Sequence, residues 1–210
     1  MDDSYWSAVR TTRLRIADLL DSLTPDEWNA ESLCPGWRVR DVAGHLALVP
    51  AITTWDMVKV APRAGFNPNR INTLLAIRHG SRDPAEIVAA IRRGADERRT
   101  AKVLDTRNNL FDAIVHSQDI ALPLHRDFLI PADDSRRGLE RVWAMGWPFN
   151  ARRRLAGITL TASDIEWTVG EGPEVTGPAL SLLLLLTGRT ATAIDALGGP
   201  GTAKLRVRTA

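Results

Sequence analysis

One segment of the 210-residue chain, from Leu110 to Leu124, carries two aspartates and a histidine on one side of an expected helix. At about 100° per residue, Asp112, His116 and Asp119 fall within about 60° of one another, and most other positions are apolar. A helix that is apolar on most sides is normally buried, and buried charged groups are paired or bind a metal. Asp112 and His116 are one turn apart, which lets a carboxylate oxygen and an imidazole nitrogen reach one ion.

A third ligand would come from His45. In its expected helix, His45 lies on the side that carries the apolar residues, so it points into the protein. Asp41, one turn earlier, is placed to orient the imidazole through a hydrogen bond. Two histidines and one carboxylate, with the fourth position left to water or substrate, form a typical catalytic zinc site. The sequence therefore predicts a metal site with His45, Asp112 and His116 as ligands.

The same residues also allow interpretations without a metal. His45 alone would be a core histidine satisfied by hydrogen bonds, and Asp112 with His116 would be a buried ion pair. Asp119 would cap a helix or pair with an arginine. Cys34 precedes Pro-Gly in a loop, and no basic or histidine residue near it in the sequence would activate its thiol. The residue types assign no general acid or base.

The composition excludes several classes of protein. The chain is 44% apolar and 25% charged, as in a folded globular protein, and 27 basic residues nearly balance 25 acidic ones. This balance argues against nucleic acid as a partner. The longest apolar run, 179–186, is too short for a membrane span, and the first ten residues do not resemble a signal peptide. One cysteine forms no intrachain disulfide. We expect a cytoplasmic protein without a membrane partner; the oligomeric state stays open.

Helical periodicity dominates the first two thirds of the chain. We expect a helical bundle over residues 1–148. One of its helices would run without interruption from Val39 to Lys59, and another would run from Asn108 to Leu124.

The pattern changes after Pro148. The segments Leu155–Ala162 and Ile165–Val169 alternate in the manner of hairpin strands. An apolar helix follows through Leu186, and Ala203–Val207 would add a strand to a small sheet. The predicted fold class is mainly α with a small α+β part, in two domains, 1–148 and 149–210.

Two motifs resemble those of a known family. Cys34-Pro35-Gly36-Trp37 followed by His45, and later Asp112-x-x-x-His116-x-x-Asp119, are similar to the mycothiol-dependent maleylpyruvate isomerase family of DinB-like metalloenzymes. The tail resembles the C-terminal region of that family in the segments Leu155–Gly157, Asp164–Trp167, Gly172–Pro178 and Leu186–Arg189.

The resemblance implies a DinB-like four-helix bundle followed by a small sterol-carrier-like α/β domain. It also implies a divalent metal, usually zinc, held at the matching positions by His45, Asp112 and His116. Asp112 stands where the family usually has glutamate. Because aspartate is one methylene shorter, the metal must lie closer to that helix or be held through water. Asp119 would replace a ligand or support one through a hydrogen bond.

The function implied by the resemblance is an isomerase or S-transferase. A low-molecular-weight thiol, mycothiol or a similar compound, would be the cosubstrate, and the metal would activate it as thiolate. The other substrate would be a small electrophilic or unsaturated acid. The alternative is a metal-free, vestigial bundle that serves as a binding or regulatory module, which the Asp112 departure favours.

Overall fold

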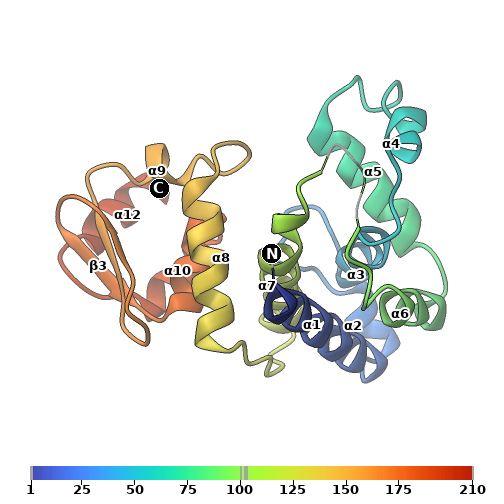
Figure 1. The fold of residues 1–210 in the computed structure, drawn as a ribbon, viewed down its shortest axis with the longest axis horizontal. Coiled ribbons are helices and arrows are strands. Elements are labelled where there is room, and N and C mark those ends of the chain that lie inside the picture. The colour runs from blue at the N-terminus through green and yellow to red at the C-terminus, as the bar shows by residue number, and fades with distance from the viewer. Residues whose placement is uncertain (1, 100, 102–103, 210) are drawn as a thin grey trace. The chain divides into compact units, whose positions relative to one another are not determined.

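The computed structural model describes residues 2–99, 101 and 104–209 and divides into two compact units, Met1–Phe128 and Leu129–Ala210 (Figure 1). Helices dominate, and a three-stranded sheet lies in the second unit, which confirms the mainly α fold with a small α+β part. Within the described residues, no helix has both the length and the apolar character that a membrane crossing requires.

The described part of the first unit is helical. Its elements are α1 (Asp3–Asp21), α2 (Pro25–Asn29), α3 (Val39–Leu48), α4 (Thr54–Val60), α5 (Pro68–Gly80), α6 (Pro84–Arg93), the 3-10 turn η1 (Thr106–Asn108) and α7 (Asn109–Ala121). Four of the helices form a closed ring, because α1 and α3 each pack against both α6 and α7. Fully buried Ile16, Ile91 and Ile114 are among the residues that fill this core. The ring positions α3 and α7, which carry the predicted ligands.

The helix α5 packs along α3 at a contact between two glycines. A Cβ atom on Gly44 would overlap the backbone of His79 and Gly80, and one on Gly80 would lie 2.6 Å from the carbonyl oxygen of Arg40. Side chains at these two positions would push the helices apart. The glycine contact therefore fixes α3, and with it His45, against α5.

The predicted continuous helix from Val39 to Lys59 is wrong. The helix α3 ends at Leu48 and α4 starts at Thr54. Pro50 has no N–H for a helical hydrogen bond, so it ends the first helix. The second starts at a capping box, in which Thr53 Oγ1 accepts from the Asp56 backbone and the Asp56 carboxylate accepts from the Thr53 backbone.

The second unit combines helices with the sheet. Its elements are α8 (Ala132–Ala144), α9 (Ala151–Arg154), β1 (Thr159–Ala162), β2 (Thr168–Gly170), β3 (Glu174–Gly177), α10 (Ala179–Leu186), α11 (Thr190–Ala193), the 3-10 turn η2 (Ile194–Ala196) and α12 (Thr202–Thr209). The first unit ends at Phe128 and the second starts at Leu129 along the chain, whereas the sequence analysis expected a division near residue 148. The reason is that α8 packs along α10 and therefore lies in the second unit.

The sheet has the order β2-β1-β3. The expected hairpin is present as the antiparallel pair β1 and β2, in which Leu160 faces Val169. The third strand differs from expectation: β3 pairs with β1 in parallel, and Leu160 faces Val175. The segment 203–207, predicted as a strand, lies in helix α12. Its sequence, Ala-Lys-Leu-Arg-Val, is rich in residues of high helix propensity, so an alternating pattern was a poor guide there.

Candidate metal centre

The polar side chains that were predicted on one side of α7 lie close to one another. Nδ1 of His116 lies 2.8 Å from Oδ2 of Asp119, an ordinary hydrogen-bond distance. Asp119 is 0% exposed. One turn toward the N-terminus, Oδ1 of Asp112 lies 3.6 Å from Nε2 of the same imidazole. The two ring nitrogens of His116 therefore face two different carboxylates.

His45 reaches the same place from α3. Its Nε2 atom lies 3.4 Å from Oδ2 of Asp112, and its ring centroid lies 4.8 Å from that of His116. His45 is buried. The amide side chain of Asn72, on α5, is a further hydrogen-bond neighbour of His45. The structure thus brings together all three predicted ligands, which come from two separate helices.

The spacing of these three groups fits a shared cation. One donor atom each of His45, Asp112 and His116 lie within 4.8 Å of one another. Two ligand atoms about 2.1 Å from a zinc ion lie about 3.4 Å apart at the tetrahedral angle. His45 Nε2 lies 3.4 Å from Oδ2 of Asp112 and His116 Nε2 lies 3.6 Å from Oδ1 of Asp112, so each imidazole is near this distance from one oxygen of the carboxylate, and both separations are long for hydrogen bonds. Aspartate is therefore long enough to reach both histidines, although it is one methylene shorter than glutamate.

The loop Cys34–Trp37 covers this group. Trp37 N–H donates to the carbonyl oxygen of Cys34 at 2.9 Å, and Gly36 has a φ of 76°. A β-turn with proline second and glycine third at positive φ is a type II turn, which explains the Cys-Pro-Gly-Trp sequence. The indole of Trp37 then stacks on the His116 ring, with a centroid distance of 6.3 Å and an interplanar angle of 15°. The turn holds an aromatic wall against the imidazole.

Cys34 is the residue that sequence reasoning missed. Its Sγ atom donates to Oδ2 of Asp119 at 3.0 Å and lies 3.7 Å from Nδ1 of His116. Cys34, His116 and Asp119 form a second group with metal-ligand spacing. The neighbours that the sequence analysis did not find around Cys34 come from α7, far along the chain. A signal existed only in the motif Cys-Pro-Gly-Trp, whose turn directs the chain toward α7.

The electrostatics of the group favour charged side chains. Burial alone would raise the pKa of Asp112, but His45, His116 and, further away, Arg13 lower it to about 2. Burial alone would likewise lower the pKa of His45, yet the adjacent Asp112 carboxylate raises it above the ordinary value. The ionised carboxylate of Asp112 attracts a positive charge, and a cation that binds here would take the place of the proton on His45.

Arg13 supplies a fixed positive charge to the interior. It is almost fully buried, and its Nη1 donates to the carbonyl oxygens of Gly94 at 3.1 Å and Glu97 at 2.9 Å. Nη2 donates to Oδ1 of Asn109, at the start of α7, at 3.1 Å. Arg13 thereby ties α1 to the end of α6 and to α7.

Asp41 has a different place from the one expected. Its carboxylate accepts from the backbone N–H of Arg38 at 3.0 Å and from Nε of the same residue at 3.2 Å. These contacts close the first turn of α3. Asp41 therefore supports the helix that carries His45, and the polar contacts of the His45 ring are with Asp112 and Asn72.

Comparison with known proteins supports the resemblance. Residues 9–106 match the family model of the mycothiol maleylpyruvate isomerase N-terminal domain. The chain is similar to the crystal structure of the mycothiol-dependent maleylpyruvate isomerase, with a TM-score of 0.64 and 12% identity over 95% of this chain and 93% of that chain. A mutant of that enzyme with one histidine replaced by alanine gives a TM-score of 0.62 and 11% identity, with the same coverage. No curated protein matches the sequence.

Proposed function

Residues 9–106 belong to the family of mycothiol maleylpyruvate isomerase N-terminal domains, and from this premise we propose that the protein is a metal- and thiol-dependent isomerase or S-transferase. Its substrate would be a small unsaturated or otherwise electrophilic acid, and mycothiol or a similar thiol would be the cosubstrate. Zinc is the metal that best suits two imidazoles and one carboxylate.

The observation that carries the proposal is the convergence of His45, Asp112 and His116. One donor atom of each lies within 4.8 Å of the others, while the other nitrogen of His116 is held by buried Asp119. A carboxylate that accepts from one ring nitrogen leaves the lone pair of the other nitrogen free to bind a metal. This arrangement is the one that a metal-binding histidine needs.

A bound divalent cation would supply the charge that lowers the pKa of a thiol and makes it reactive as thiolate. The side chains of the protein would position the reactants. Trp37 shields one side of the His116 ring from water, and Asp119 keeps that ring in one orientation. The thiolate sulfur would add to one carbon of a cis double bond, rotation about the resulting single bond would follow, and elimination of the thiol would give the trans isomer.

Metal content tests this proposal directly. The untagged full-length chain, dialysed against metal-free buffer, should retain about one zinc per chain by elemental analysis, and His45→Ala and His116→Ala should lose it. His125→Asn is the matched control, because it removes an exposed histidine at a positive φ that asparagine tolerates. Thiol-dependent isomerisation of cis-unsaturated dicarboxylates, followed by the change in ultraviolet absorbance, should disappear with the metal.

A metal-free binding module is the second candidate. It is favoured by the hydrogen bonds of Asp119 with His116 and Cys34, which are complete without a cation. In that case the same elemental analysis would find no bound metal in the unchanged protein, and the thiol assay would show no conversion. That pair of results would replace the enzymatic proposal with this one.

We further propose that the ring of α1, α3, α6 and α7 is a DinB-like four-helix bundle and that the second unit is a sterol-carrier-like domain. The ring of helix contacts supports the first assignment, and the sheet flanked by α10 supports the second. Limited trypsin digestion should cut first near Arg126, at the junction of the two units. First cleavage at Arg152 would instead support a boundary near residue 148.

A further inference from the structure

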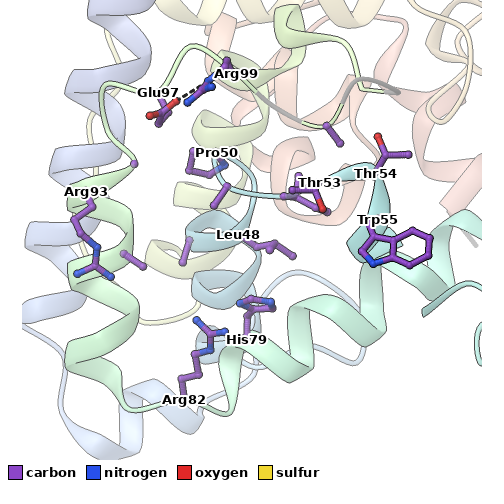
Figure 2. A pocket seen from close by; sticks show the side chains of 16 residues that line it. Leu48, Pro50, Thr53, Thr54, Trp55, His79, Arg82, Arg93, Glu97 and Arg99 are labelled. Atoms are coloured by element: carbon purple, nitrogen blue, oxygen red, sulfur yellow. Dashed lines mark hydrogen bonds and ion pairs between the residues drawn. The ribbon is translucent and has the colours of Figure 1, made fainter. Parts of the chain in front are cut away.

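A cavity lies in the first unit, away from the metal ligands. It has a volume of about 880 Å³ and lies between the end of α3, the segment that leads into α4, the end of α5, and α6 (Figure 2). This volume is within the range of pockets that bind small organic molecules. The residues that line it do not include His45, Asp112 or His116.

The cavity uses a different side of α3 from the metal centre. Ala47 and Leu48 line the cavity, and His45 lies two residues before Ala47. Two positions along a helix rotate the side chain by about 200°, so His45 and Ala47 point in nearly opposite directions. A molecule in the cavity would therefore occupy a site of its own.

The inner wall of the cavity is small and apolar. Ala47, Leu48 and Pro50 are buried, and Ala90 lines the wall that α6 contributes. Trp55, which is 63% exposed, lies at one edge of the cavity (Figure 2). This lining offers a surface for the apolar part of a ligand.

The charged groups around this wall are mostly positive. Arg82, between α5 and α6, and Arg93, on α6, line the cavity near His79, and Figure 2 shows these side chains around it. The acid among the lining residues described is Glu97, which is already paired with Arg99 at 3.3 Å. Within the part of the chain that the structure describes, Arg82 and Arg93 form no ion pair. Two guanidinium groups without acidic partners at an apolar cavity are complementary to an anion.

We propose that this cavity binds an amphiphilic organic anion, whose carboxylate or phosphate lies against Arg82 and Arg93 and whose apolar body lies against Ala47, Leu48 and Ala90. The inference goes beyond the proposed catalytic function and does not depend on a metal. The proposed ligand needs both an anionic group and an apolar body. The proposed site therefore differs from a plain phosphate site, which needs no apolar wall, and from a nonspecific apolar patch, which needs no arginines.

Calorimetric titration of the full-length chain tests the proposal with three probes. The first probe, 2-naphthoate, should bind with one molecule per chain. The neutral alcohol 2-naphthalenemethanol and inorganic phosphate should each bind at least about tenfold more weakly, because each lacks one of the two interactions. Equal affinity for the alcohol would overturn the role of the arginines, and equal affinity for phosphate would overturn the role of the apolar wall.

Variants locate the probe in the cavity. The double variant Arg82→Gln/Arg93→Gln should weaken naphthoate binding at least about tenfold, and Ala90→Phe should abolish it by filling the space without a change of charge. Arg70→Gln, which removes an exposed arginine of α5 outside the cavity, is the matched control and should bind as the unchanged protein does. His116→Ala should also bind naphthoate normally. If His116→Ala lost this binding, or if the double variant kept it, the probe would lie elsewhere and the proposal would fail.

Discussion

The thiol of Cys34 donates a hydrogen bond to Oδ2 of Asp119 at 3.0 Å, although 85 positions separate the two residues in the chain. The same oxygen lies 2.8 Å from Nδ1 of His116. Since Asp119 is completely buried, water does not compete for these contacts. A single carboxylate oxygen thus links the Cys-Pro-Gly-Trp turn to the histidine that we propose as a metal ligand.

Asp119→Asn should weaken metal binding. The amide of asparagine can donate to Nδ1 of His116 and leave the proton on Nε2, where it blocks coordination. We expect metal affinity to fall about 10–100-fold, measured by competition with a chromogenic chelator. Cys34→Ser, which keeps a donor to Asp119, should stay close to the unchanged protein. Equal affinities in Asp119→Asn and the unchanged chain would show that Asp119 does not select the nitrogen that binds.

Substitutions of Asp112 should distinguish the effect of its negative charge on metal binding from the effect of its side-chain length. Its two carboxylate oxygens lie near His45 and His116, respectively. Asp112→Asn removes the charge at almost constant size, so we expect the purified protein to lose its metal. Asp112→Glu keeps the charge and lengthens the side chain by one methylene, so metal should remain stoichiometric by elemental analysis. Retention of metal by the asparagine variant would argue against Asp112 as a ligand.

Gly44→Ala should destabilise the first unit. The added methyl group would overlap the backbone of α5 at Gly80, and the two helices would have to separate. Overpacking of this kind typically costs about 1–3 kcal/mol, which should appear as a lower urea midpoint. Gly146→Ala is a suitable control, because a Cβ atom there would lie 3.8 Å from its nearest neighbour. If both variants unfolded at the same urea concentration, the close helix contact would not limit stability.

The stability of the protein should depend on the protonation of His79. Burial, with the nearby charges of Arg82 and Arg78, lowers the pKa of His79. The unfolded chain binds this proton more readily, so the stabilising contribution is fully present above about pH 6.5 and is lost as the pH falls through the lowered pKa.

Urea unfolding in chelator-containing buffer, from about pH 7.5 to about pH 5, measures this effect over the range in which histidine titrates. The unchanged protein should lose more stability than His79→Gln over this range, while His125→Asn should follow the unchanged protein. A parallel pH dependence in the unchanged protein and His79→Gln would rule out a contribution from His79.

Much of the candidate centre could be predicted from local pattern. Helical periodicity placed Asp112, His116 and Asp119 on one side of a helix and turned His45 inward, and the structure shows these side chains together. Periodicity succeeds here because α3 and α7 are each buried on most sides, so the few polar positions stand out. The break at Pro50 had a local signal too, in the proline and the capping box at Thr53, but the apolar pattern concealed it.

The sequence alone thus determined which side chains each helix turns inward, because side-chain direction within a helix follows from backbone geometry. It could not determine which helices become neighbours. The contact of Cys34 with Asp119, the glycine contact between α3 and α5, and the parallel pairing of β3 with β1 each join segments whose approach depends on the packing of the whole unit. Only the tertiary structure decided these contacts, since nothing in the local chain distinguishes one apolar neighbour from another.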